Sequence, residues 1–347
     1  MAIFGSDANY VGLDIGTTAI RAVQLRGGNV PKSIVTYGAL QVDSNIMRSD
    51  SNDAQQQIGQ LIQQLLTDIN VTSREVVVGL PSSKVFTSVV DLPRVDAKDR
   101  ENSIKFQVEQ FLPTSLSEST VDWVVLGPSP VDQNKDEVLL VSAVNKNTEA
   151  RLSLLESVGL EVVSIEADSV GLVRSLIPPT FTGAAMLLDF GAHSTDLIIV
   201  YNGAPRLVRS LPIGGENLVK SAMTNLNVDE SQARQFINKF GVSKDKLEGQ
   251  LYRAIEGNIN SLLEEINKSI KFFSNRYGNV QIEKVVVNGG ASQLPEFPNF
   301  LLGELNIGIE IGNPWQNISY PNTIQANLMS SAASFGVATG LALRSGD

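Results

Sequence analysis

The sequence lacks cysteine altogether and contains a single histidine, His193. Without thiols, and with one imidazole, the chain has no means of forming a disulfide, a thiolate zinc site, a cysteine nucleophile or a histidine-rich metal cluster. A Ser-His-Asp triad would have to use His193. Charged residues make up 18% of the chain and hydrophobic residues 42%, a balance typical of folded globular proteins.

Long apolar runs are also absent. No window approaches the roughly 18 uninterrupted apolar residues of a membrane-spanning helix, and the first residues, MAIFGSDANYVGLD, lack the basic region and apolar stretch of a signal peptide. The formal net charge of −10 argues against non-specific binding to nucleic acid or anionic lipid. We therefore expect a soluble, cytoplasmic protein of about two domains.

The most informative feature that is present is an internal repeat. Each half of the chain opens with three short apolar segments that read as a meander of strands, and in each half the first strand ends in an aspartate followed by a glycine bend with small or polar residues. The dipeptide Asn202-Gly203 is a strong hairpin signal in the second meander. The predicted strands are 10–14, 19–25 and 32–42 in the first half, and 185–189, 196–201 and 206–211 in the second.

Helical patterns lie between and after the meanders. Residues 53–69 carry apolar side chains at helical spacing, with residues 51–53 as candidate caps, and the stretches 215–240 and 249–277 are also helical. In the last of these, the apolar stripe predicts a core-facing side. Its members are Ile255, Ile259, Leu262, Leu263, Ile266, Ile270 and Phe273.

These patterns predict a duplicated α/β fold. We assign residues 1–84, together with 161–183 and 325–347, to a first lobe, and residues 184–324 to a second lobe with a helical subdomain at about 213–280. Residues 85–160 read as a separate small α+β module, in which strands accompany the helices RENSIKFQVEQFL and NTEARLSLLESVG.

The two aspartate bends predict a phosphate site. A carboxylate at a strand end, followed by a bend with free backbone N–H groups and hydroxyls, can hold phosphate, and two such bends facing each other can grip a polyphosphate. Asp14 and Asp189 would hold Mg²⁺ on the phosphates, mostly through water, because Mg²⁺ keeps much of its hydration shell. The other candidate residues are the glycines Gly16 and Gly191, which allow close backbone approach, and the hydroxyls of Thr17, Thr18, Ser194 and Thr195.

Ordinary turn chemistry is the alternative explanation, because Asp and Gly are common in hairpin turns. Two copies at matched positions in matched meanders favour the phosphate-binding interpretation. Neither a P-loop nor a Rossmann fingerprint occurs in the chain. His193 lies inside the second bend, where it either touches phosphate or fills the turn.

Three segments resemble the phosphate 1, phosphate 2 and adenosine motifs of the actin-like ATPases, in matching order and spacing: VGLDIGTT, LLDFGAHSTDL and VVVNGGASQLPEF. The resemblance implies duplicated actin-like (RNase H-like) domains around a nucleotide cleft, with ATP and Mg²⁺ as cofactors. It assigns Gly289, Gly290 and Ala291 to adenosine, Gly214 and Gly215 to the nucleotide, and Asp168 and Asp189 to catalytic positions. Glu166 is the alternative to Asp168, and the short aspartate side chain leaves hydrolysis in doubt.

The same resemblance places Glu265, Lys268 and Ser269 opposite the ribose and base. Their other interpretation is a solvated helix face, on which Glu264 and Lys268 form an i,i+4 pair.

Within this superfamily, residues 85–160 resemble the extra subdomain of the PilM family, the cytoplasmic actin-like proteins of type IV pilus assembly. The segments SVGLEVVSIEADSVGLVRSL and IGGENLVKSA also fit that family, and the resemblance runs from about residue 10 to 343. FtsA-type division proteins share the relocated subdomain but end in an amphipathic membrane-targeting helix, which the terminus GLALRSGD does not supply.

The PilM resemblance implies an adaptor in which closure of the nucleotide cleft alters a surface on the first lobe and the extra subdomain. That surface would bind the cytoplasmic N-terminal peptide of a PilN-type single-span membrane protein, so that the chain reaches the inner face of the membrane through its partner. The apolar edge with Val85, Phe86, Val89 and Leu92 is the candidate lining. A small-molecule kinase or turnover ATPase and a polymerising actin-like filament remain the alternatives.

Overall fold

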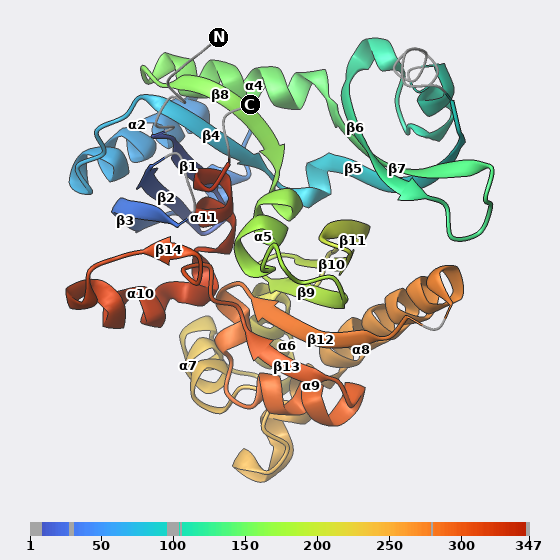
Figure 1. The fold of residues 1–347 in the computed structure, drawn as a ribbon. Helices are drawn as coiled ribbons and strands as arrows, with labels where there is room; N and C mark the ends of the chain where they lie inside the picture. Colours follow the sequence, from blue (N-terminus) through green and yellow to red (C-terminus); the bar gives the residue numbers. More distant parts are fainter. Residues whose placement is uncertain (1–8, 28–30, 96–103, 105, 279, 345–347) are drawn as a thin grey trace.

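A computed structural model describes residues 9–27, 31–95, 104, 106–278 and 280–344. Figure 1 shows two lobes, each built on a β-sheet, and a third, smaller sheet that projects beside them. Residues 100–103 and 105 of the predicted helix RENSIKFQVEQFL lie outside the described residues, as do the first eight residues of the chain.

The first lobe contains a six-stranded sheet with the order β14-β3-β2-β1-β4-β8. Its first three strands form the predicted antiparallel meander, and β4 and β8 then add in parallel to β1. The strands are β1 (Val11–Ile15), β2 (Ala19–Arg26), β3 (Lys32–Gln41), β4 (Glu75–Leu80), β8 (Glu161–Ala167) and β14 (Ile318–Ser319).

The second lobe repeats this plan in a five-stranded sheet with the order β11-β10-β9-β12-β13. The predicted Asn202-Gly203 hairpin is confirmed, because both residues have positive φ values, 50° and 72°. The strands are β9 (Ala184–Phe190), β10 (Thr195–Tyr201), β11 (Ala204–Leu211), β12 (Ile282–Asn288) and β13 (Gly308–Ile311).

The inserted subdomain is a three-stranded antiparallel sheet with the order β5-β7-β6. Because side chains alternate along a strand, this sheet has two distinct faces. One face packs Val90, Leu92, Val138 and Leu140 into the subdomain's own core. The strands are β5 (Val85–Pro93), β6 (Ser119–Pro128) and β7 (Lys135–Val144).

Helices cover both large sheets. Ser51 accepts a hydrogen bond from the backbone of Ala54 (3.3 Å) and caps the first long helix, as the sequence predicted. The helices are α1 (Ser44–Met47), α2 (Asn52–Asp68), α4 (Asn145–Ser157), α5 (Asp168–Leu176), α6 (Gly215–Leu226), α7 (Glu230–Phe240), α8 (Gln250–Tyr277), α9 (Phe297–Leu305), α10 (Gln325–Ser331) and α11 (Gly336–Ala342).

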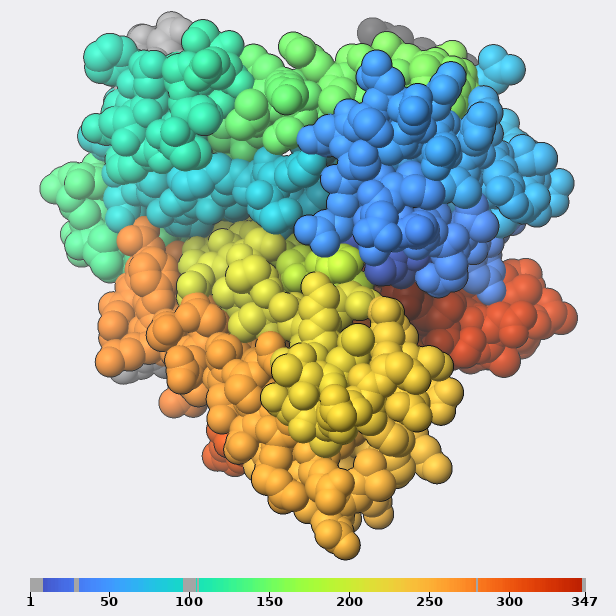
Figure 2. Space-filling model, turned by 180° about the vertical axis from the view of Figure 1, so that it is seen from behind, coloured from blue at the N-terminus to red at the C-terminus, as the bar shows by residue number. Residues whose placement is uncertain are grey.

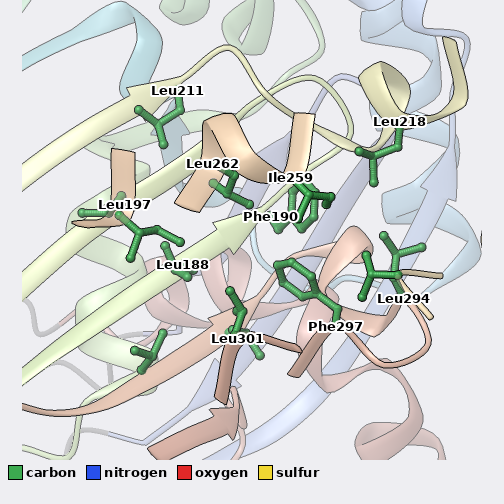
Figure 3. Packing of buried hydrophobic residues seen from close by; sticks show 14 of the residues in the cluster. Leu188, Phe190, Leu197, Leu211, Leu218, Ile259, Leu262, Leu294, Phe297 and Leu301 are labelled. Atoms are coloured by element: carbon green, nitrogen blue, oxygen red, sulfur yellow. The ribbon is translucent and has the colours of Figure 1, made fainter. Parts of the chain in front are cut away.

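Helix α8 supplies much of the second lobe's core. Its residues Ile259 and Leu262 pack with Phe190 and Leu211 of the sheet, as Figure 3 shows. The predicted apolar stripe of this helix is therefore confirmed. At fully buried positions such as these, loss of side-chain volume costs about 2–5 kcal/mol.

Helices α5 and α11 lie between the two large sheets (Figure 1). They approach so closely that a Cβ on Gly340 of α11 would lie 1.8 Å from the carbonyl oxygen of Gly171 of α5. Helix α11 also lies against β1, where a Cβ on Gly12 would lie 2.0 Å from the carbonyl oxygen of Ala338. Glycine is required at these contacts, and the two lobes share a packed hinge region.

The structure corrects two domain boundaries. Leu154 and Leu155 of α4 pack into the core of the first lobe, so that this helix belongs to the lobe and the inserted subdomain ends with β7. Strand β14 pairs with β3, and Trp315 packs with Val23, so the chain returns to the first lobe before residue 318 rather than at 325. Figure 2 shows the returning red segment beneath the blue first lobe.

Candidate nucleotide site and partner surface

The two aspartate bends have the same backbone geometry. In the first turn the N–H of Gly16 donates to the carbonyl oxygen of Ala19 (3.1 Å), and in the second the N–H of Gly191 donates to that of Ser194 (2.9 Å). A Cβ added to either glycine would lie 3.0 Å from the same carbonyl oxygen. The repeat seen in the sequence is thus a repeat of hydrogen-bonded turns.

Each turn also presents free backbone donors. Among the described residues, no hydrogen bond uses the N–H groups of Thr17 and Thr18 in the first turn or of Ala192 and His193 in the second. Consecutive N–H groups in a tight turn form a concavity that binds anions. The two turns therefore fit phosphate groups.

The first turn pairs its carboxylate with a cation. Asp14 faces Arg21 across the β1–β2 ladder, and Nη1 of Arg21 donates to Oδ2 of Asp14 at 3.2 Å. Burial raises the pKa of Asp14, and Arg21 offsets part of that rise. The sequence analysis did not single out Arg21.

The second turn pairs its carboxylate with another carboxylate. Asp189 faces Asp196 across the β9–β10 ladder. Burial, followed by the negative charge of Asp196, raises the pKa of Asp189 to about 7, although Nδ2 of Asn288 donates to Oδ1 of Asp189 at 2.6 Å. Sequence reasoning missed Asp196 and Asn288, although Asp196 stands seven residues after Asp189, as Arg21 does after Asp14.

Asp168 opens helix α5 and is buried beside Gly79, where its Oδ1 has no hydrogen-bond partner. Burial and then the charges of Asp14, Asp196 and, more weakly, Asp189 raise its pKa well above the usual range. The structure thus brings both predicted aspartates and the predicted catalytic residue into one electrostatically coupled group.

Glu166, the alternative catalytic residue, is engaged in ion pairs, and its catalytic role stays a prediction. Its carboxylate forms ion pairs with Arg174 (2.8 Å) and Arg344, which commit it to holding the C-terminal segment on β8.

A cavity of about 1130 Å³ connects the two turns. Gly16 and Thr17 line it from the first turn, and His193 and Ser194 from the second. Thr195 does not serve as predicted, because its fully buried hydroxyl donates to the carbonyl oxygen of Ile213 at 2.6 Å.

The predicted adenosine residues lie against the second turn. The N–H of Gly215 donates to the carbonyl oxygen of Gly191 (3.0 Å), and a Cβ on Gly215 would be 3.5 Å from that of Ala291. Gly289 has a φ of 86°, and a Cβ there would lie 2.5 Å from the carbonyl oxygen of Phe190. Gly214 and Gly290 stand next to these residues in the chain, so that the glycine-rich segments meet at one place.

The three predicted residues of α8 form one cluster with Arg209 of β11. Nη2 of Arg209 donates to Oε2 of Glu265 (2.5 Å), and Nζ of Lys268 donates to its Oε1 (2.7 Å). Ser269 is buried and donates to the backbone carbonyl of Glu265. None of the three lines the cavity between the turns, and their contact with a nucleoside stays a prediction.

The predicted partner edge does not form one surface, because strand alternation divides it. Leu92 is 2% exposed and lies in the subdomain core, so it is wrong as a lining residue. Val85 and Phe86 line a 380 Å³ hollow beside Pro113 at the start of β5, whereas Val89 lies beside Leu139 on the face opposite to Leu92.

That opposite face of the subdomain sheet borders an apolar cavity of about 460 Å³. Its walls come from three parts of the molecule: Val124, Leu139 and Val141 of the subdomain, Val173 and Pro178 in and after α5, and Pro205 of the β10–β11 hairpin. Val124 is 51% exposed.

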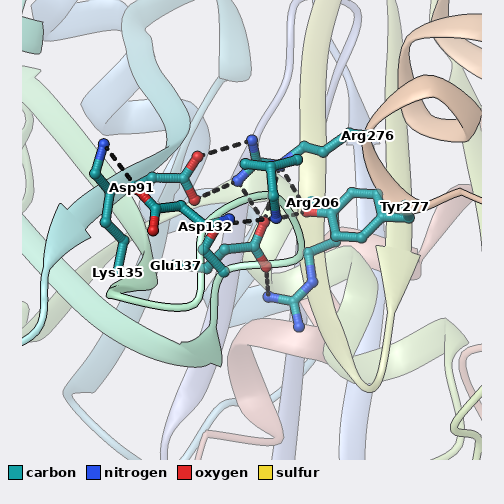
Figure 4. A network of polar contacts seen from close by, with 9 residues as sticks. Asp91, Asp132, Lys135, Glu137, Arg206, Arg276 and Tyr277 are labelled. Atoms are coloured by element: carbon teal, nitrogen blue, oxygen red, sulfur yellow. Dashed lines mark hydrogen bonds and ion pairs between the residues drawn. The ribbon is translucent and has the colours of Figure 1, made fainter.

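The same face carries the carboxylates of a polar network that joins the subdomain to the second lobe (Figure 4). Arg276 at the end of α8 donates to both oxygens of Asp91 (2.7 and 3.0 Å) and to Oε1 of Glu137 (2.7 Å). The hydroxyl of Tyr277 also donates to Glu137 (2.6 Å). Burial opposes ionisation of Asp91, yet the hydrogen bonds from Arg276 lower its pKa.

Among the described residues, no group of three or more His, Cys, Asp or Glu side chains is arranged to hold a metal ion by itself. No helix in the same ranges is long and apolar enough to cross a membrane.

Solved structures show the fold. The PilM-PilN type IV pilus biogenesis complex contains a chain 23% identical to this one, with a TM-score of 0.82 over 98% of this chain and 99% of that one. MreB5 of Spiroplasma citri bound to AMPPNP matches with a TM-score of 0.54 at 12% identity, over 95% of this chain and 94% of the other. The predicted actin-like fold is thereby confirmed.

Cell division protein FtsA of Bacillus subtilis (strain 168) is 22% identical over 258 residues, which are 67% of this chain and 58% of FtsA. The alignment thus spans little more than half of that relative. The sequence model of the family described as type IV pilus assembly protein PilM matches residues 12–346. The chain therefore belongs to the PilM family of type IV pilus assembly proteins.

Proposed function

We propose that the protein is an ATP- and Mg²⁺-binding adaptor of type IV pilus assembly that holds the cytoplasmic N-terminal peptide of a PilN-type membrane protein. The observation that carries the nucleotide part is the pair of identical turns facing one cavity. In this proposal the chain works at the cytoplasmic face of the inner membrane and reaches the membrane through its partner.

The triphosphate lies between the turns. The free N–H groups and the hydroxyls of Thr17, Thr18 and Ser194 bind phosphate oxygens, while Asp14 and Asp189 reach Mg²⁺ mostly through water. Mg²⁺ neutralises charge on the phosphates and is compatible with few direct carboxylate ligands. The negative charges of Asp14, Asp189 and Asp196, gathered around the buried Asp168, favour a bound cation.

Hydrolysis is expected to be slow. Burial and neighbouring negative charges favour the protonated form of Asp168, and a protonated carboxyl group does not act as a general base. The bound nucleotide then serves mainly to hold the two lobes together.

The apolar cavity of about 460 Å³ is the site that we propose for the partner peptide. Its apolar walls suit the hydrophobic side chains of a short peptide. The exposed face of the subdomain sheet gives the peptide backbone a flat surface to lie against. The PilM-PilN complex, to which this chain is similar, shows that a protein of this fold forms such a complex.

The Arg276 network supplies the connection between the two sites. Because Asp91 and Glu137 hold the end of α8, a movement of the second lobe on nucleotide binding displaces the subdomain sheet as well. That sheet and the β10–β11 hairpin are both walls of the apolar cavity, so cleft closure changes the width of the peptide site.

A thermal denaturation series tests the nucleotide part. Mg-ATP at 100 times its dissociation constant stabilises the protein by about 2.7 kcal/mol, which raises the melting temperature, and Asp14→Ala removes most of this rise. An equal rise in the variant would contradict the phosphate site. Release of phosphate at more than about one turnover per second would favour an enzyme over an adaptor.

Fluorescence anisotropy with a labelled N-terminal peptide of the PilN-type partner tests the adaptor part. Val124→Asp places a charge in the cavity and is expected to weaken binding at least about tenfold. Val131→Asp is the matched control, because this valine is 60% exposed on the same subdomain and does not line the cavity. Phe86→Ser tests the other hollow; if it alone abolishes binding, the peptide site is there and the proposed cavity is wrong.

A further inference from the structure

The large cavity contains a partly buried arginine, Arg151, that is not paired with a carboxylate in the described part of the chain. Arg151 of α4 lines the cavity together with Gly16, Thr17 and Ser194 of the two turns. No hydrogen bond or ion pair among the described residues involves its guanidinium group. Two other arginines near the site have carboxylate partners, Arg21 with Asp14 and Arg234 with Glu216.

Arg151 is also set apart by its burial. Four further cations line the cavity, and all of them are exposed to solvent: Arg48, Lys84, Lys146 and Lys220. Arg151 is half-buried, and the negative charges of Asp168 and Asp14 act on it. Burial lowers the pKa of Arg151 and these two carboxylates oppose that effect.

A half-buried guanidinium group without a hydrogen-bonding partner is unfavourable unless an anion binds it. Its five donors suit phosphate oxygens, which a guanidinium can bind in a bidentate manner. The first and second turns already place phosphate groups on the opposite wall of the same cavity in the proposed function.

We infer that Arg151 binds the terminal phosphate of the nucleoside triphosphate held between the two turns. This inference rests on the proposed nucleotide site. It gives the chain a residue that distinguishes a triphosphate from a diphosphate, and it places that residue on the helix that directly follows the subdomain.

The position of Arg151 connects the phosphate to the partner surface. Helix α4 begins at Asn145, immediately after β7 ends at Val144, and Leu139 and Val141 of β7 line the apolar cavity. A terminal phosphate that orders Arg151 therefore also orders the helix that follows this strand. Loss of that phosphate removes the contact from α4.

The test uses a fluorescent nucleotide to measure the dissociation constants of Mg-ATP and Mg-ADP. The proteins compared are the unmodified full chain and single-residue variants of it. Arg151→Met is expected to weaken Mg-ATP binding about 10- to 100-fold and to change Mg-ADP binding less than about threefold. Lys239→Met, at an exposed lysine of α7 that does not line the cavity, is the control and is expected to leave both affinities unchanged. Circular dichroism checks that each variant is folded.

Arg151→Lys keeps the charge without the bidentate geometry and is expected to recover part of the Mg-ATP affinity. If Arg151→Met weakens ATP and ADP equally, or neither, the assignment to the terminal phosphate is overturned. If the unmodified protein binds no nucleotide, the proposed function fails first and the inference with it. The two failures are thus distinguishable.

Discussion

The two phosphate turns share a backbone and differ in charge. Both close with the same hydrogen bond, and both present two free N–H groups. Across the strand ladder, however, the first turn sets Arg21 against Asp14, whereas the second sets Asp196 against Asp189. Duplication has kept the geometry that fits phosphate and has let the electrostatics diverge.

This difference in charge gives the two turns different requirements for Mg²⁺. Arg21 compensates Asp14, so the first carboxylate is stabilised without a ligand. Asp189 and Asp196 form a like-charged pair, in which Asp189 accepts a hydrogen bond from the neutral amide of Asn288 and the charge of Arg21 acts on it more weakly. The second turn therefore has the greater need for Mg²⁺, and substitutions at equivalent positions should have opposite effects on stability.

The largest effect is expected from Arg21→Gln. Removing this arginine leaves the buried Asp14 without its ion-pair partner, and breaking a buried pair costs about 3 kcal/mol. Urea unfolding at pH 7 measures the loss. Arg94→Gln is the control, because its pair with Asp136 is about half exposed on the arginine side and should contribute less than about 1 kcal/mol. Equal stability of Arg21→Gln and the unmodified protein would contradict the assignment.

Asp196→Asn is expected to have the opposite effect, that is, to increase the free energy of unfolding. The folded-state pKa of Asp189, about 7, lies above its ordinary value, so the stability that Asp189 contributes is present at low pH and is lost as the pH rises through 7. Removing the charge of Asp196 lowers that folded pKa and reduces the loss. We expect the variant to be more stable by about 1–2 kcal/mol at pH 8.

The comparison requires unfolding measurements at pH 5.5 and pH 8 without nucleotide or Mg²⁺. The gain from Asp196→Asn should be smaller at pH 5.5, where Asp189 is protonated. Asp122→Asn, at an exposed aspartate, serves as the control. A variant less stable than the unmodified protein at pH 8 would show that Asp196 is not a source of repulsion.

The smallest effect is expected at the glycine that occupies the same position in both turns. Gly16→Ala and Gly191→Ala each place a Cβ 3.0 Å from a carbonyl oxygen, and each should destabilise the protein by about 1 kcal/mol. Thermal denaturation of the two variants is expected to give similar losses. A loss confined to one turn would show that the two backbones are not equivalent.

The sequence was sufficient for the features that depend on short-range pattern. The strand-end aspartates, the glycine bends and the Asn202-Gly203 hairpin are local, and local turn chemistry specifies them. Asp196 could have been found as well, since its spacing from Asp189 equals that of Arg21 from Asp14.

Other features depend on packing that the sequence does not display. The faces of β5 were assigned by apolar content alone, and the alternation of the strand then placed Leu92 in the core and Val89 on the opposite side. Arg151 faces the turns only because α4 packs onto the first lobe, which is a contact between distant segments. Strand β14 joins the first sheet for the same reason.

The central claim is that both turns bind one nucleotide, and a crystal structure with Mg²⁺ and a non-hydrolysable ATP analogue tests it most directly. We predict phosphate oxygens on the backbone N–H groups of Thr17 and Thr18 and of Ala192 and His193, with the metal ion between Asp14 and Asp189. A nucleotide held by one turn alone, or bound outside the cavity between them, would contradict the account.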